Sequence, residues 1–141
     1  MKVKTIYIVF FLVATIVFGC KNDKNSINKS IIVPEGLVFN NGEKWIANTE
    51  THIGMKRIDS ILKNTTYLDG KVLGEALSKE TSYIIKNCDM TGIAHDQLHI
   101  VLVPILEEIT YIKDVTETNR LKDKVTYIKG LVSTYFQYFK T

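Results

Sequence analysis

The sequence contains very little cysteine, with only Cys20 and Cys88 among its 141 residues. Two cysteines cannot form the network of bridges that staples small secreted domains, so a disulfide framework is excluded. The chain also lacks a strong excess of one charge, since it has 18 basic and 15 acidic residues, and Lys2 and Lys4 precede an apolar N-terminal run. Nucleic acid binding needs a clustered basic surface, so no nucleic-acid partner is expected.

The N-terminus has the pattern of a secretion signal. The basic start MKVK precedes an apolar run from Thr5 to Phe18, which is short for a membrane span, and Gly19 and Cys20 follow. The segment VFGC resembles the lipobox of bacterial lipoproteins, although Phe18 stands where that family has a small residue. The resemblance implies that Cys20 carries fatty acyl chains such as palmitate and becomes the first mature residue. An uncleaved N-terminal membrane anchor is the alternative.

The lipobox resemblance also implies a domain organisation and a location. We expect a signal peptide at 1–19, a flexible, lipid-anchored tether at 20–38 with a polar sequence, and one folded domain at 39–141. Acyl chains on Cys20 would hold the protein on a membrane without spanning it. Lys21 follows the cysteine where inner-membrane lipoproteins tend to have aspartate, so the resemblance favours the outer membrane of the cell envelope, facing the periplasm or the cell surface. The sequence identifies no protein partner.

Strands are not indicated, because no segment alternates apolar and polar residues with a period of two. Apolar residues instead recur every three or four positions in four segments, at about 49–63, 70–88, 93–114 and 117–140. Asn48 is well suited to cap the first of them. Short connections between the segments predict an all-α, antiparallel up-down-up-down four-helix bundle. The predicted core residues are Leu98, Leu102, Ile105, Ile109, Val125, Ile128, Val132 and Tyr135.

Such a topology would bring the starts of the first and third helices to the same end as the finishes of the second and fourth. Every histidine and Cys88 fall near one of these four helix ends. The six candidate metal ligands at this end of the bundle are His52, Met55, Cys88, Met90, His95 and His99.

Two of these residues have the spacing of a chelating pair. His95 and His99 are four positions apart, so their side chains share one face of a helix and can bind one ion. The sequence HDQLH has Asp96 where a metalloprotease has glutamate, and no protease is predicted. Imidazole, thiolate and thioether ligands together favour copper or zinc over magnesium or calcium. We therefore predict a copper or zinc site used for buffering, delivery or sensing.

The same residues have other interpretations. Met55 and Met90 are commonly core filler, Cys88 can be a small buried residue, and His95 can bond a backbone carbonyl. A helical bundle can also ligate b-type haem, whereas covalent haem is excluded because no C-x-x-C-H motif is present. A protein-interaction module without a ligand is a further alternative. We do not expect an enzyme, since a Cys88 nucleophile with His95 as base would lack a third, orienting group.

Two segments carry a second resemblance. The sequences NNGEKW, at 40–45, and CDMTGIAHDQLH, at 88–99, resemble a group of small bacterial envelope proteins. In that group an Asn-Gly-x-x-Trp entry precedes a helical domain with a C-x-M-x-G-x-x-H-x-x-L-H segment. The likeness extends over residues 39–140. It implies a helical bundle in the cell envelope, and it assigns no activity.

Overall fold

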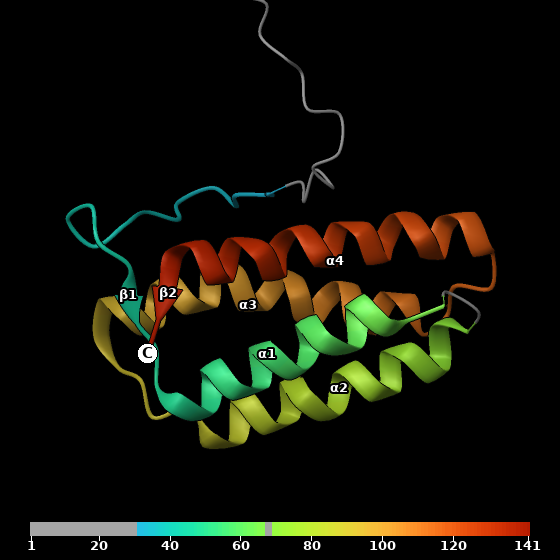
Figure 1. The fold of residues 1–141 in the computed structure, drawn as a ribbon, viewed down its shortest axis with the longest axis horizontal. Coiled ribbons are helices and arrows are strands. Elements are labelled where there is room, and N and C mark those ends of the chain that lie inside the picture. Colours follow the sequence, from blue (N-terminus) through green and yellow to red (C-terminus); the bar gives the residue numbers. More distant parts are fainter. Residues whose placement is uncertain (1–30, 67–68) are drawn as a thin grey trace, which may run out of the picture.

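The computed structural model describes residues 31–66 and 69–141, so the predicted signal peptide, Cys20 and the tether up to residue 30 lie outside the described part. Its four helices confirm the predicted all-α, four-helix fold (Figure 1). None of the helices in the described ranges is both long and apolar enough to span a bilayer. The helices are α1 (Thr49–Asn64), α2 (Gly70–Asn87), α3 (Gly92–Ile112) and α4 (Thr118–Tyr138).

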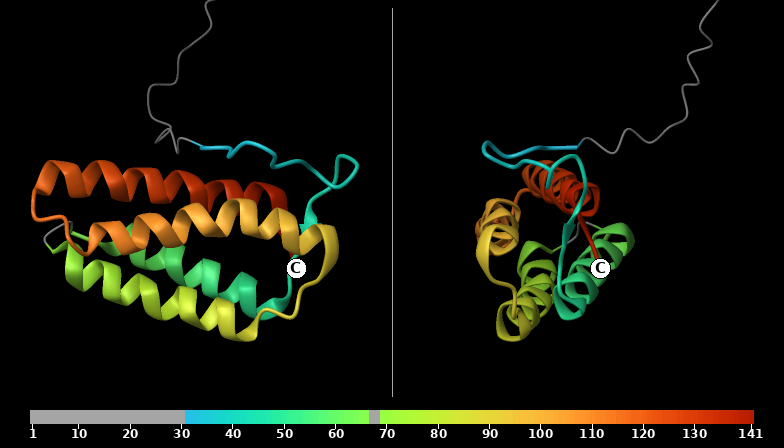
Figure 2. Two further views of the ribbon diagram at one scale, coloured as in Figure 1. Left: turned by 180° about the vertical axis from the view of Figure 1, so that it is seen from behind. Right: turned by 90° about the vertical axis from the view of Figure 1, so that its left-hand side faces the viewer.

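Consecutive helices run in opposite directions, as the colours of Figures 1 and 2 show. Contacts between helix ends agree with this arrangement. The side-chain amide of Asn48, before α1, donates a 2.8 Å hydrogen bond to the carbonyl of Asn87 at the end of α2. Gly70, the first residue of α2, lies so close to the end of α3 that a Cβ there would be 2.2 Å from the carbonyl oxygen of Ile112.

The predicted position of the first helix is right, but its expected cap is not formed. Asn48 is the N-cap of α1, and yet its side chain makes no capping hydrogen bond to the first turn. The amide nitrogen instead bonds Glu50 at 3.2 Å and the carbonyl of Asn87. Asn48 therefore joins α1 to α2, and this tertiary contact replaces the local cap.

The core lies between the four helices and follows their apolar faces. All eight predicted core residues are buried, with exposed fractions of no more than 5%. α1 and α2 approach closely at Gly54, where an added Cβ would lie 2.3 Å from Cγ1 of Ile84. The 3.6-residue period of the sequence therefore identified the buried faces correctly.

The chain before α1 forms a strap, defined here as residues 31–47, which runs over α4 in Figure 1. It turns back at Asn41 and Gly42, whose positive φ angles of 51° and 88° suit a tight Asn-Gly turn. Near its end the strap contains β1 (Trp45–Ile46), which pairs in parallel with β2 (Phe139–Lys140) near the C-terminus.

The strap corrects the predicted boundary between tether and domain. The hydroxyl of Thr134 donates a 2.6 Å hydrogen bond to the carbonyl of Ile32, and Leu37 is buried in the core with 6% exposed. Residues 32–38 are thus packed against the bundle, although the sequence placed them in a flexible tether. Their apolar residues fall in two adjacent pairs, Ile32–Val33 and Leu37–Val38, which match neither a helical nor a strand period.

Candidate metal site

The predicted ligands lie at the end of the bundle where the strap joins it. Lys44 of the strap donates a 2.8 Å hydrogen bond to the carbonyl of Phe136, near the end of α4. The backbone N–H of Ala47 donates to the carbonyl of Lys140 at 2.8 Å. The hydrogen bond between Asn48 and Asn87 shows that the start of α1 and the end of α2 also lie in this region. α3 begins at Gly92, five residues after Asn87.

His95 and His99 form the tightest contact among the predicted ligands. Their ring centroids are 4.3 Å apart, and the ring planes are inclined at 61°. Both residues lie in the first two turns of α3, where His95 is half-buried and His99 is exposed. The pair is therefore reachable from solvent, and its spacing is the one that the HDQLH sequence predicts.

His52 contacts two aromatic residues near the end of α4. Its Nδ1 lies 3.2 Å from the hydroxyl of Tyr135, and its ring packs edge-on against Phe136 with centroids 5.5 Å apart. Burial lowers the pKa of His52, and the positive charges of Lys56 and Lys44 lower it further. The neutral imidazole is therefore favoured, and its Nδ1 is already engaged by the Tyr135 hydroxyl.

The sulfur-containing residues are held by packing. Met55 is fully buried, whereas Met90 and Cys88 are partly buried against the core. Burial raises the pKa of Tyr135, and Cys88 raises it further. These placements match the core-filler interpretation of the three residues.

The predicted residues share one end of the bundle, and their histidines make two separate side-chain contacts. Within the described ranges, no group of three or more histidine, cysteine, aspartate or glutamate side chains is placed to hold a metal ion. His95 and His99 contact each other, whereas His52 contacts Tyr135. The larger ligand set, with His52, Cys88, Met55 and Met90, stays a prediction.

Sequence reasoning missed the role of Gln97, which lies between the two histidines in the chain. Gln97 is only 8% exposed. Its Oε1 accepts a 2.8 Å hydrogen bond from the N–H of Val38, and its Nε2 donates to the carbonyl of Gly36 at 3.3 Å. The turn that carries the histidines therefore also anchors the strap. A polar residue beside Leu98 on an otherwise apolar face was the only available signal.

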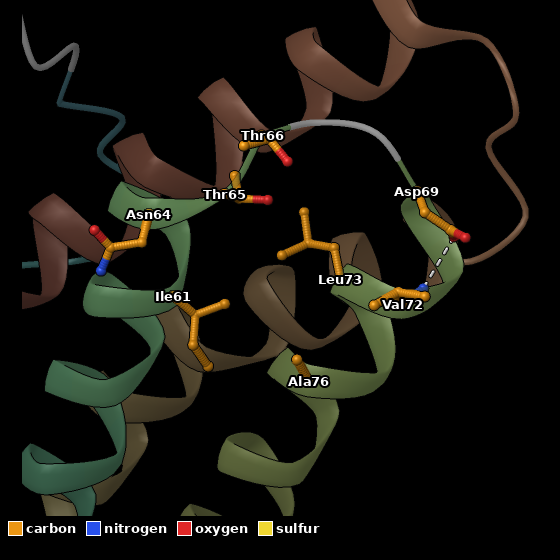
Figure 3. Close-up of a pocket in the computed structure, with 8 residues that line it drawn as sticks. All are labelled: Ile61, Asn64, Thr65, Thr66, Asp69, Val72, Leu73 and Ala76. Carbon is orange, nitrogen blue, oxygen red and sulfur yellow. Dashed lines mark hydrogen bonds between the residues drawn. The ribbon is translucent and has the colours of Figure 1, made fainter.

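The pockets of the described residues lie elsewhere. A pocket of about 370 Å³ opens between the end of α1 and the start of α2, away from the histidines (Figure 3). Ile61, Leu73 and Ala76 supply apolar surface, and Asn64 and Asp69 are polar. None of the four pockets found in the described ranges is lined by histidine, cysteine or methionine.

No protein-family model, no curated protein and no solved structure matches the chain.

Proposed function

We propose that this protein is an envelope lipoprotein whose helical bundle binds a zinc or copper ion through His95 and His99. One observation carries the metal proposal. The two imidazole rings lie with centroids 4.3 Å apart on successive turns, at the solvent-accessible start of α3. The lipobox pattern supports the lipid anchor on Cys20, and Lys21 after it supports a location at the outer membrane, facing the periplasm or the cell surface.

The chemistry of the pair suits these ions. Neutral imidazole is a common ligand of zinc and copper, and two histidines on successive helical turns can bind one ion without moving the backbone. Small rotations about the side-chain bonds of His95 and His99 would aim one nitrogen of each ring at a shared metal. Because the backbone of α3 already sets the spacing, little ordering entropy opposes binding.

Two protein ligands leave coordination positions open. Structural zinc sites are closed by four protein ligands, so a site with two would bind more weakly and exchange its ion readily. Exchange is what buffering or delivery in the envelope requires. Cys88 and Met90 precede α3 in the chain and would make the site softer, but each would first have to leave its packed position. They are thus additional ligands only after a local rearrangement.

Metal titration of the full-length chain, purified in a non-ionic detergent without chelator, tests the proposal. We expect saturable binding of Zn²⁺ or Cu⁺ that weakens as the solution is acidified, because protons compete with the metal for the imidazole nitrogens. Replacing both residues, His95→Ala with His99→Ala, should abolish binding. His52→Gln is the matched control, since it removes an imidazole but keeps a hydrogen-bond acceptor for Tyr135. Unchanged affinity in the double variant would refute the site.

A further inference from the structure

We propose that the strap residues 31–33 and the N-terminal half of α4 form a face that lies against an anionic phospholipid surface. The proposal rests on the lipid anchor of the proposed function, and it adds the orientation in which the anchored bundle sits. Three observations carry it: the distribution of charge among the helices, the exposed side chains of the face, and the point at which the chain leaves the bundle.

α4 is the most basic helix of the bundle. It carries four basic residues and one acidic residue, all between positions 120 and 129. α3 carries three acidic residues and no lysine or arginine, while α1 and α2 each have three basic and two acidic residues. Anionic lipids attract lysine and arginine held near the surface, so α4 is the helix that such a membrane would attract.

The strap restricts this basic surface to one half of α4. Gly130, Ser133 and Thr134 are buried, and Thr134 bonds the carbonyl of Ile32. The strap therefore covers the C-terminal half of the helix and leaves the half with Arg120 and Lys122 exposed. Figures 1 and 2 show the strap running over α4, on the side of the bundle away from α2.

The exposed face also carries apolar and aromatic side chains of the kind found at membrane surfaces. Ile31 and Val33 of the strap are 50% and 49% exposed, on either side of the anchored Ile32. Tyr127 is 38% exposed, and the ammonium of Lys124, which pairs with Glu108 of α3 at 2.9 Å, lies 6.0 Å from the centre of its ring. Amphipathic tyrosines beside lysines are typical of the boundary between water and lipid.

The length of the chain outside the described part limits the distance to the membrane. Cys20 precedes Ile31 by 11 positions, which can span at most about 40 Å even when fully extended. A 21-residue helix such as α4 is itself about 30 Å long. A lipid on Cys20 would therefore keep the exit point at Ile31 within roughly one bundle length of the bilayer.

Site-specific fluorescence on vesicles tests the orientation. The full chain carries Cys88→Ala, so that the native thiol takes up no label. A polarity-sensitive probe is then attached to a new cysteine, either Thr126→Cys on the exposed half of α4 or Ser82→Cys on the exposed surface of α2. The protein is reconstituted on phosphatidylglycerol or phosphatidylcholine vesicles, and quenching by acrylamide is measured. We expect the probe at position 126 to be shielded several-fold more on phosphatidylglycerol, and the probe at position 82 to behave alike on both.

Charge variants separate lipid contact from general crowding at the surface. Lys122→Gln with Lys129→Gln should weaken docking by about fivefold for each lysine, and about 1 M salt should remove the shielding. Lys79→Gln with Lys86→Gln on α2 is the matched control and should leave both the docking and the shielding of the probe at position 126 unchanged. Equal shielding of both probes on a lipidated chain would refute the orientation alone. Uptake of the label by Cys20 would show that no lipid is attached, and would refute the anchor together with the orientation.

Discussion

The hydroxyl of Tyr135 lies 3.2 Å from Nδ1 of His52 and joins α4 to α1 across 83 positions of the chain. Tyr135 is fully buried, and its ring stacks on Phe139 with centroids 5.1 Å apart. Burial raises the pKa of the hydroxyl, so it stays protonated and can donate to the imidazole. The contact therefore ties the first helix to the C-terminal end of the bundle beside β2.

Removing this hydroxyl should destabilise the fold while leaving the packing intact. Tyr135→Phe keeps the ring but leaves Nδ1 of His52 without its partner, which should cost about 0.5–1.5 kcal/mol in the free energy of unfolding. Urea denaturation followed by circular dichroism measures this. Tyr138→Phe is the control, since its ring stacks on Phe39, and it should change stability by less than about 0.5 kcal/mol. Equal losses in the two variants would mean that the His52–Tyr135 bond adds nothing.

The same imidazole should make stability depend on pH. Burial, followed by the charges of Lys56 and Lys44, lowers the pKa of His52 below its ordinary 6.5. Between the lowered pKa and 6.5, the unfolded chain therefore binds more protons at this site than the folded chain. The contribution of His52 to the free energy of unfolding is therefore fully present above about pH 6.5. It decreases as the pH falls toward the pKa that His52 has in the folded chain.

The variant His52→Gln isolates this pH dependence. Unfolding free energies of the two proteins are compared at several pH values from 7.5 down to 5, where all other groups contribute equally to both. We expect the advantage of the wild-type chain to shrink with acidity in that range. Parallel curves for the two proteins would show that the imidazole has the same pKa in the folded and unfolded chains.

The helices and the core could be read from the sequence because both follow from local periodicity. All four helices begin within one residue of the predicted position, and all end within two. Leu98, Leu102, Ile105 and Ile109 on α3 recur every three or four positions, and each is buried. An apolar stripe specifies its own buried face without reference to the rest of the chain.

The partners of the polar residues could not be read in the same way. His52 and Tyr135 are 83 positions apart. The sequence contains no local pattern that would favour a contact of His52 with Tyr135 over a contact of His52 with His95. The strap was also missed, because β1 and β2 are only two residues long and their parallel pairing joins the two ends of the domain. Such contacts depend on how completed helices pack. The connectivity placed the histidines at one end, but side-chain directions decide which of them meet.

The assignment of the core face can be tested on adjacent residues of α3. Leu102 is 5% exposed, and its neighbour Val103 is 42% exposed. Leu102→Ala should therefore lower the free energy of unfolding by about 2–5 kcal/mol through lost burial and a residual cavity. Val103→Ala should change it by less than about 0.5 kcal/mol. Chemical denaturation measures the loss of unfolding free energy in both variants. A larger loss for Val103→Ala than for Leu102→Ala would contradict the assignment of the buried face of α3.

The close approach of α1 and α2 predicts a strict size limit at Gly54. A Cβ at this position would lie 2.3 Å from Cγ1 and 2.9 Å from Cδ1 of Ile84. Gly54→Ala should cost about 1–3 kcal/mol, because the isoleucine or the helices must shift. Ile84→Ala removes the obstructing atoms, so the double variant should lose less stability than the sum of the two single changes. Additive losses would mean that the two residues do not meet.

Gln97 predicts how firmly the strap is held. Its Oε1 accepts from the N–H of Val38 and its Nε2 donates to the carbonyl of Gly36, while the residue itself is 8% exposed. Gln97→Ala should leave both strap groups without these partners and cost about 1–3 kcal/mol. Gln97→Glu is the sharper comparison, because a carboxylate still accepts from Val38 but repels the carbonyl of Gly36.

Hydrogen exchange at Val38 distinguishes a local effect of these variants from a global one. Loss of the glutamine should speed exchange of the Val38 amide much more than exchange in the middle of α3, since the strap can open while the bundle stays folded. The glutamate variant should fall between the wild-type protein and the alanine variant. If the Val38 amide and the α3 amides accelerate together, the strap and the bundle unfold as one unit, and Gln97 stabilises the whole domain instead of a separable segment.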